Sequence, residues 1–407
     1  MGTAIVIGAG IVGLSTAWHL QERGYEVTVL DRTGVAAGSS WGNAGWLTPG
    51  KAIPLAHPSL WSYGPRALLD PDAALHVPFR VEPGLWSFLA RFLGHATPRA
   101  WDRTMAALTP VDKLALEAFD ELGLGGVDSW TRPGPFVVGF EDEAQSRTFQ
   151  GEVAGAVRHG QDVPFERLTD PRELAPQLSD AVRVAFRLDG QRFLEPGPYV
   201  EALGRAVVER GAHVRSGVEV TGVSSTRKPV VALATGERTS ADVVVVATGA
   251  WLPRLARPLG VRVAVQAGRG YSFTVATDQP ARHPVYLPHA RLACTPYQGR
   301  FRIAGTMEFR GPDEPFQPGR IAAIVRHARR LLTGVDLEDR QDEWVGSRPV
   351  TPDGLPLVGA TRAPGVYVAG GHGMWGMVLG PVTGRLLAER IATGETHPAI
   401  APFDPLR

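Results

Sequence analysis

A glycine-rich turn near the start of the chain holds the first residues with an evident chemical use. Gly8, Gly10 and Gly13 are spaced as G-x-G-x-x-G, after a short apolar run at residues 4–7 and before a helical pattern. The first glycine permits a tight turn, the second lets a pyrophosphate approach the backbone, and the third lets the helix pack against the strand. The spacing therefore predicts a phosphate-binding turn.

A helix start and an acidic residue complete this unit. The N–H groups around Ile11 and Val12 begin the predicted helix, where unpaired donors and a partial positive charge favour phosphate. A second predicted strand, residues 27–30, delivers Asp31 about 20 residues beyond the turn, where a carboxylate can accept from ribose hydroxyls. Together these features predict a nucleotide-binding βαβ unit, against the alternative of an ordinary strand-to-helix turn.

A second strand, glycine turn and helix follow near the other end of the chain. Residues 366–369 form the predicted strand, 370–377 read GGHGMWGM, and an apolar helical pattern comes next. A flavin uses such a helix start, because reduction places negative charge where helix-end N–H groups can bind it. We therefore expect both glycine turns to meet at one flavin.

The segment after Asp31 is rich in Gly, Ser and Asn and lacks regular periodicity. We expect Ser39 and Ser40 to bind the cofactor's phosphates and residues 43–47 to pass its reactive ring. The alternative is a turn-rich linker.

Composition limits the possible functions. The chain has 407 residues, enough for two or three domains, and a net charge of +1, which argues against a nucleic-acid surface. Its one cysteine, Cys294, excludes an intrachain disulfide, and the 11 histidines show no metal-ligand spacing, so we predict no metal site. Neither a signal peptide nor a membrane-spanning run is evident, which predicts a cytoplasmic protein and leaves peripheral contact with the inner membrane face open.

The first half of the remaining chain alternates helices and strands. Tryptophan and leucine recur between prolines over residues 58–124, which predicts short helices covering a cofactor. Strands are predicted at 134–140 and 182–188, with helical residues 143–157 between them. A helix with Val200 and Leu203 on its apolar face comes next.

The second half returns to a buried sheet and then to turn-linked strands. A strand is predicted at 218–223, followed by a hairpin-like return to the sheet through 230–233 and 242–247. Strands over 261–309 suit the floor of a substrate pocket, and the helix at 320–332 is predicted to face its arginines outward.

These elements predict an α/β fold, α+β overall. A Rossmann-like FAD-binding domain would comprise residues 1–50, 196–258 and 345–407. A discontinuous substrate-binding or cap domain, built on a mixed or antiparallel sheet, would comprise 51–195 and 259–344.

From residue 4 to about 391 the chain resembles the FAD-dependent oxidoreductases of the glycine oxidase and D-amino acid oxidase superfamily. It is most similar to the D-amino acid dehydrogenase branch. The resemblance rests on GAGIVG, GNAGWLTP, LLDPDAALHVPFRVEPGLWSFLARFL, VVVVATGAW, AGRGYSF, GRFRIAGTMEF, RPVTPDGLPLVG and GGHGMWGM.

The resemblance implies FAD and assigns residues to its parts, and we expect noncovalent binding because Cys294 is distant in sequence from the motifs at the flavin edge. At the pyrophosphate and adenosine half it implies Gly8, Gly10, Ile11, Val12, Gly13, Asp31, Arg32, Ser39, Ser40, Val220, Thr248, Gly249 and Trp251. At the isoalloxazine it implies Asn43, Ala44, Gly45, Trp46, Leu47, Gly371, Gly373, Met374, Trp375, Gly376 and Met377.

Four residues are candidates for the substrate site, of which Arg348 lies in the RP loop that the resemblance places at the pocket. Arg348 would hold a carboxylate with its guanidinium fork, or form a structural salt bridge. Tyr271 would donate to the same carboxylate, or be a packed core aromatic. His372 would line the pocket, but support of the glycine turn is the simpler interpretation. Lys51, where relatives carry other pairs, would meet an acidic substrate or influence reaction with oxygen, while a solvated loop lysine is the simpler interpretation.

The function implied is oxidative deamination of a small amino acid, foremost a D-amino acid, by hydride transfer from Cα to flavin N5. The imino product would hydrolyse to a 2-oxo acid. Sarcosine, glycine, D-hydroxyproline or a 2-hydroxy acid are alternative substrates, and a flavin subunit of a heteromeric electron-transfer complex is an alternative of another class. The electron acceptor would be oxygen or a quinone-type partner, with homo-oligomerisation open.

Overall fold

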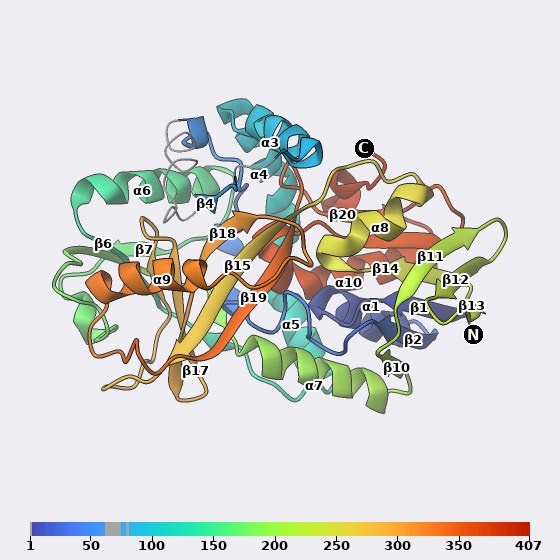
Figure 1. Ribbon diagram of the computed structural model, residues 1–407, viewed down its shortest axis with the longest axis horizontal. Coiled ribbons are helices and arrows are strands. Elements are labelled where there is room, and N and C mark those ends of the chain that lie inside the picture. Colours follow the sequence, from blue (N-terminus) through green and yellow to red (C-terminus); the bar gives the residue numbers. More distant parts are fainter. Residues whose placement is uncertain (1, 62–74, 79–80) are drawn as a thin grey trace.

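The computed structural model describes residues 2–61, 75–78 and 81–407. Two large sheets lie side by side (Figure 1), with the elements of the first glycine turn on the right and the strands of the predicted substrate domain on the left. The predicted helical residues 62–74, and part of the motif at 68–93, lie outside the described residues.

The six-stranded sheet contains both glycine turns. Its strand order is β10-β2-β1-β14-β21-β20, all parallel except β20, which is antiparallel to β21. The strands are β10 (His213–Ser216), β2 (Glu26–Asp31), β1 (Thr3–Ile7), β14 (Val243–Val246), β21 (Val366–Gly370) and β20 (Leu357–Ala360). Their central residues are apolar and buried, as a parallel sheet covered on both faces requires.

Helices cover one face of this sheet. The two helices that follow the glycine turns, α1 (Ile11–Glu22) and α10 (Gly376–Thr393), pack on each other, and α7 (Pro196–Glu209) packs on α1. The other face is covered by α8 (Leu252–Ala256) and a three-stranded antiparallel sheet of β11 (Val220–Ser225), β12 (Pro229–Leu233) and β13 (Arg238–Ser240).

That small sheet corrects one expectation. The apolar run at 230–233 was predicted to return to the main sheet, but it pairs with β11 and β13 instead. Only alternate residues of β12 are buried, and a strand with one buried face suits a covering layer. β10, which was not predicted, joins the main sheet beside β2.

The nine-stranded sheet has the order β19-β15-β18-β17-β16-β6-β8-β7, with β4 beside β18. Its strands are β19 (Gln341–Val350), β15 (Gln266–Val275), β18 (Arg300–Phe309), β17 (Leu292–Tyr297), β16 (Val285–Leu287), β6 (Phe136–Phe140), β8 (Val184–Leu188), β7 (Phe165–Arg167) and β4 (Leu75–His76). The helix α9 (Pro318–Leu331) packs on β15, β17 and β18, and α6 (Glu143–Arg158) packs on β6. Arg320 is buried at the start of α9, so not all of that helix's arginines face outward as predicted.

The helices α3 (Pro83–His95), α4 (Pro98–Asp112) and α5 (Ala115–Leu124) divide between the two halves. α3 packs with Phe309 of β18, whereas the end of α4 and all of α5 join the core formed by α1, α7 and α10. Arg385 of α10 also pairs with Glu121 of α5. The expectation that these helices all form a cap is therefore wrong for α5, because its apolar stripe completes the nucleotide-side core.

Short elements connect these layers. They are β3 (Trp46–Leu47), β5 (Arg132–Pro133), β9 (Arg192–Phe193) and the 3-10 turns η1 (Pro49–Lys51), η2 (Pro171–Glu173), η3 (Gly249–Trp251), η4 (Arg257–Leu259), η5 (Gly373–Trp375) and η6 (Pro398–Phe403). No helix among the described residues is long and apolar enough to cross a bilayer.

Candidate functional site

The first glycine turn has the close contacts that its spacing predicts. Gly8 has φ +115°, and a Cβ there would clash with the carbonyl of Ala247 on the neighbouring strand. A Cβ at Gly13 would clash with the carbonyl of Gly8, so this glycine lets α1 start tightly against the turn. Gly10 opens toward the Ser40 hydroxyl. The backbone is therefore shaped for close approach of another group.

Asp31 anchors the turn that it was predicted to complete. Its Oδ2 accepts from the N–H of Ala9 at 2.8 Å, and its Oδ1 accepts from the N–H groups of Thr33 and Gly34 at 2.8 and 2.9 Å. An ionised carboxylate has about four acceptor sites, so one is left for a ribose hydroxyl. The side chain lines the first cavity, where that acceptor is useful.

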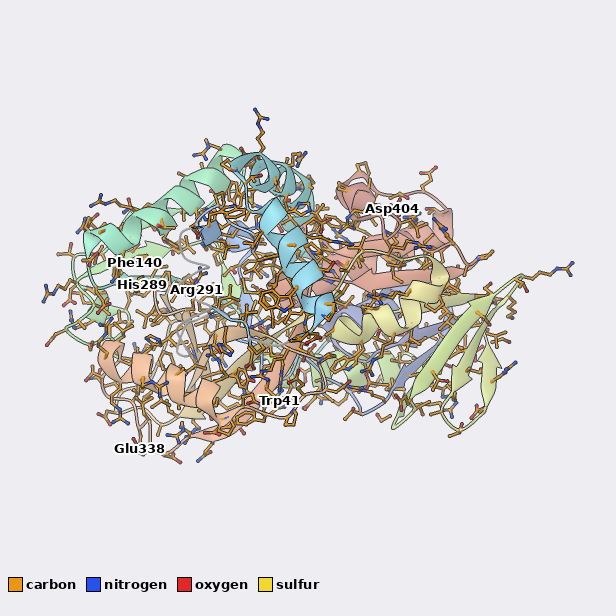
Figure 2. The ribbon with its side chains drawn as sticks, turned by 45° about the horizontal axis from the view of Figure 1, so that its top comes forward. Trp41, Phe140, His289, Arg291, Glu338 and Asp404 are labelled. Atoms are coloured by element: carbon orange, nitrogen blue, oxygen red, sulfur yellow. The ribbon has the colours of Figure 1, made fainter. Side chains whose placement is uncertain are left out.

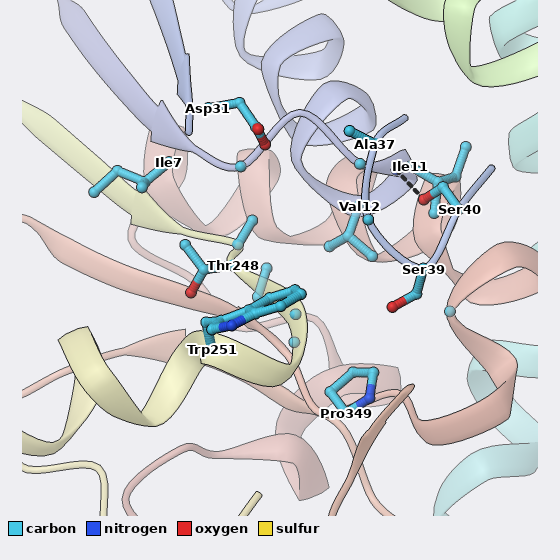
Figure 3. Close-up of a pocket in the computed structure, with 18 of the residues that line it drawn as sticks. Ile7, Ile11, Val12, Asp31, Ala37, Ser39, Ser40, Thr248, Trp251 and Pro349 are labelled. Atoms are coloured by element: carbon cyan, nitrogen blue, oxygen red, sulfur yellow. Dashed lines mark hydrogen bonds between the residues drawn. The ribbon is translucent and has the colours of Figure 1, made fainter. Parts of the chain in front are cut away.

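The serine segment closes over the turn. Ser40 Oγ accepts from the N–H of Ile11 at 3.2 Å, as the dashed line in Figure 3 marks. The hydroxyl of Ser39 donates to the carbonyl of Ser347 on β19. Both serines line the same cavity, and Ser39 links it to the strand that carries Arg348.

The two glycine turns, at residues 8–13 and 370–377, line one cavity, which we call the first cavity. Figure 3 shows its nucleotide side, between the turn after β1, the serine segment and η3. Its lining includes Gly8, Gly10, Ile11, Val12, Asp31, Arg32, Ser39, Ser40, Asn43, Val220, Thr248, Gly249, Trp251, Arg348, His372, Gly373, Met374, Gly376 and Met377. The empty space is about 1360 Å³ including its open part. Because both glycine turns line it, one extended dinucleotide could contact both, whereas a small metabolite could not.

An ionic cluster stands at the nucleotide end. The Arg32 guanidinium lies 4.1 Å from the centre of the Trp251 ring, and Asp313 accepts from Arg32 at 3.2 Å and from Trp251 Nε1 at 2.8 Å. Asp313 also pairs with Arg254. These contacts hold the pKa of Asp313 below its ordinary value despite partial burial.

A second cavity meets the first one at Asn43, Arg348 and Met374. It lies against the nine-stranded sheet and is lined by aromatic and aliphatic side chains with a few polar ones. Ala44, Trp46, Lys51 and Trp375 are the other predicted residues in its lining. Such apolar walls with few polar groups are typical of substrate sites.

Arg348 occupies the junction of the two cavities. Its Nη1 donates to the carbonyl of Thr306 at 3.2 Å, and no carboxylate within the described residues forms an ion pair with it. Burial lowers its pKa to about 10, which leaves it charged at neutral pH. The structural salt bridge considered from sequence is absent from the described part of the chain, and an anion would satisfy the free donors.

Lys51 is not the solvated loop lysine that sequence favoured. It is buried, its Nζ donates to Glu152 Oε2 of α6 at 2.7 Å, and it lies 4.4 Å from the centre of the Phe149 ring. The ammonium group holds the pKa of Glu152 below its ordinary value, although burial alone would raise it. Lys51 therefore belongs to a paired site at the wall of the second cavity.

His372 follows the second glycine turn and lines the first cavity. The ring is buried, its Nε2 lies 2.9 Å from Thr383 Oγ1 of α10, and burial lowers its pKa to about 4. A neutral ring hydrogen-bonded to the following helix agrees with the interpretation that it supports the turn.

Tyr271 lies in the core of the nine-stranded sheet. Its hydroxyl donates to Glu308 Oε2 at 2.8 Å, and burial with this contact raises its pKa. It is absent from the lining of both cavities. The structure therefore favours the packed aromatic over the carboxylate-binding role that sequence proposed for it.

Four predicted cofactor residues, Gly13, Gly45, Leu47 and Gly371, are absent from the lining of both cavities. Gly45 and Gly371 adopt φ +76° and +73°, and Leu47 packs in the core shared by α1 and α10. These residues set the backbone conformation and the packing beneath the residues that line the cavities. No group of side chains within the described ranges could hold a metal ion.

Sequence reasoning missed Arg302, whose side chain supports the predicted ring-contacting segment. It is buried, lies 3.7 Å from the centre of the Tyr297 ring, and donates to the carbonyls of Trp41 and Asn43 at 3.1 and 3.4 Å. Strand alternation in the motif at 299–309 could have indicated an inward arginine. No pattern in the sequence indicated the positive φ of Thr306, +56°, or that Glu152 would pair with Lys51.

Known protein sequences are similar to this chain over nearly its full length. The family model for FAD-dependent oxidoreductases, DAO, matches residues 3–390. A D-amino acid dehydrogenase of Methylobacterium sp. is 32% identical over 98% of this chain and 97% of its own length. One of Xanthobacter autotrophicus is 30% identical over 95% and 94%.

The fold has counterparts among solved structures as well. Glycine oxidase from Geobacillus kaustophilus superposes over 100% of this chain and 99% of its own with a TM-score of 0.74, at 22% identity. Iminodiacetate oxidase from Chelativorans sp. superposes with a TM-score of 0.69, at 20% identity. These likenesses confirm the predicted fold. The family match over residues 3–390 and the near full-length relatives establish that the chain is an FAD-dependent oxidoreductase of the DAO family.

Proposed function

We propose that this enzyme deaminates an amino acid oxidatively, with a D-amino acid as its substrate. The near full-length relatives named D-amino acid dehydrogenase support this choice of substrate. The observation that carries the proposal is Arg348, a charged guanidinium at the junction of the two cavities with no carboxylate partner in the described chain. A substrate carboxylate supplies the missing partner and is held bidentately.

The first cavity fits FAD by its own chemistry. The backbone at Gly8, Gly10 and Ile11 would hold the pyrophosphate and Asp31 a ribose, while the N-terminal end of α10 borders the junction at Met374. When bound there, FAD supplies the two-electron acceptor that oxidation of the substrate Cα–N bond requires. Arg348 then positions the substrate where the two cavities meet.

The charges around the second cavity favour the neutral amine that oxidation needs. Among the described residues its lining includes the cations Lys51, Arg291 and Arg348 and no carboxylate. Positive charge near an ammonium group lowers its pKa, so the bound amine loses its proton more readily than in water. We therefore expect kcat/KM to rise with pH and to level off below the pKa of the free amino acid.

The deciding experiment is anaerobic addition of D- and L-amino acids to the yellow protein while the flavin absorbance is followed. Bleaching by D-amino acids supports the proposal, and its absence with every amine overturns it. Sarcosine, glycine, D-hydroxyproline and 2-hydroxy acids belong in the same panel, because bleaching by these alone would assign one of the alternative substrates.

The electron acceptor belongs to the same proposal. Oxygen consumption by the isolated chain would identify an oxidase. Reoxidation by a soluble quinone, with slow reaction toward oxygen, would identify a dehydrogenase that transfers electrons to a membrane carrier. Failure of the isolated chain to turn over any substrate that bleaches it would favour a subunit of a heteromeric complex.

A further inference from the structure

The second cavity extends across the sheet well beyond Arg348. Ala304, Ala293, Tyr286 and Val138 are successive cross-strand neighbours on β18, β17, β16 and β6, and all four line the cavity. Three strand spacings amount to about 14 Å. Because Arg348 donates to Thr306 on β18, its guanidinium lies at one end of this row. A substrate with a side chain as small as that of alanine would leave most of the row uncovered.

The floor of the cavity changes character along the row. Alanines on β18 and β17 leave open space near Arg348. Farther on, aromatic rings form the walls: Trp46 packs edge-on against Phe136 and Tyr286 at 5.3 and 5.2 Å, and Tyr286 packs against Phe149 at 6.3 Å. An extended apolar or aromatic group fits between them, and each methylene that it buries strengthens binding roughly fourfold.

Positive charge stands at the far end. Lys51 lies on the Phe149 ring beyond Tyr286, and the guanidinium of Arg291 is near enough to Glu152 to lower that carboxyl's pKa. In Figure 2, Arg291 lies on the same side of the molecule as Phe140 of β6. Glu152 itself is outside the cavity lining and uses one of the three Lys51 donors.

We propose that the second cavity selects amino acids whose side chain is long and apolar or aromatic and ends in a carboxylate or another hydrogen-bond acceptor, and that Lys51 binds this end. The proposal rests on the proposed function, because it takes Arg348 to hold the α-carboxylate. It names the substrate class of the same site. Substrates with a cationic end meet like charge and no lining carboxylate within the described residues, so the site rejects them.

Equilibrium binding tests the cavity without turnover. The probes are 3-(4-carboxyphenyl)propanoate, 3-phenylpropanoate and 3-[4-(aminomethyl)phenyl]propanoate, titrated calorimetrically into the FAD-loaded protein. We expect the dicarboxylate to bind at least tenfold tighter than 3-phenylpropanoate, and the aminomethyl compound at least tenfold more weakly. Equal affinities would overturn the proposal.

Three variants locate the selectivity. The double substitution Lys51→Met with Glu152→Gln removes the cation without leaving a buried charge, and it should abolish the tenfold preference for the dicarboxylate. Lys228→Met removes another ion-paired lysine, at an exposed position beside Asp242, and should keep the preference. Ala293→Leu should lower the kcat/KM ratio of D-phenylalanine to D-alanine at least tenfold by narrowing the floor.

The two levels of the proposal fail separately. Selective binding without flavin bleaching by any amino acid would reject the proposed function but keep the cavity's preference. Bleaching by D-amino acids without selectivity, or an unchanged preference in the double variant, would reject this inference alone.

Discussion

The guanidinium of Arg348 lies directly over Gly270, and a Cβ at that glycine would clash with its Cζ, Nη1 and Nη2 atoms. β15 therefore has no side chain at the position that Arg348 of β19 crosses to reach Thr306 of β18. The absent side chain is what allows the cation to reach the junction of the two cavities.

Gly270→Ala should consequently displace the guanidinium while leaving the cofactor turns intact. We expect KM for the amino acid to rise at least tenfold and FAD affinity to stay within about twofold, measured by steady-state kinetics and flavin fluorescence. Gly319→Ala is the matched control, because nothing lies within 4 Å of a Cβ there. Equal KM values in both variants would contradict the proposed role of Arg348.

Arg348→Met should lower activity without lowering stability. Loss of the charge pair with the substrate is worth about 2–5 kcal/mol, so kcat/KM should fall at least 30-fold. The free energy of unfolding should not fall, because the guanidinium is desolvated and lacks a carboxylate partner among the described residues. Arg300→Met, which removes an arginine paired with Asp339 at 3.0 Å, should instead destabilise the protein in chemical denaturation.

Lys51→Met should leave the buried carboxyl of Glu152 without its partner. Breaking a buried pair in this way costs about 3–5 kcal/mol, and adding Glu152→Gln should recover most of that loss. Urea denaturation of the two variants measures the difference. A single variant as stable as the double one would show that the pair carries no coupling.

The same pair predicts a pH dependence. The pKa of Glu152 is lower in the folded chain than its ordinary value of 4.5. Its contribution to stability is therefore complete above about pH 4.5 and is lost as the pH falls through the folded-state pKa. Acid unfolding of the wild type and the double variant should diverge in that range.

Asp112 provides a test of the opposite sign. It is fully buried, accepts from Gln161 at 2.7 Å, and burial raises its pKa well above the ordinary 3.8. The folded protein keeps a proton that the unfolded chain releases, so stability falls as the pH rises above 3.8 until the folded-state pKa is passed. Asp112→Asn should flatten this slope in thermal unfolding between pH 5 and pH 8. A slope equal to that of the wild type would exclude Asp112 as its source.

The part of the site that sequence predicted depends on local spacing. Gly8, Gly13 and Asp31 have their roles fixed by one βαβ unit, and the buried runs at 243–246 and 366–370 place the second turn in the same sheet. Neighbouring residues carry that information, so the fold class and the shared cavity followed from sequence and family resemblance.

Sequence could not show the contacts between distant segments. Lys51 meets Glu152 101 residues away, and Tyr271 donates to Glu308 37 residues away, so no local pattern reveals either pair. α5 has the same amphipathic pattern whether it covers a cofactor or completes another core. Which face it meets depends on α10, more than 250 residues later. The division into two domains stays a proposal, which the membership of the two large sheets supports.

The hydroxyl of Ser39 spans from the cofactor's cavity to the carbonyl of Ser347, the residue immediately before Arg348. Through this hydrogen bond we predict that occupancy of the nucleotide site is coupled to the position of the Arg348 guanidinium. Thermodynamic reciprocity then requires that flavin loading and carboxylate affinity change each other by an identical factor. The affinity for a simple carboxylic acid should therefore differ between apoprotein and holoprotein, even where no redox reaction takes place.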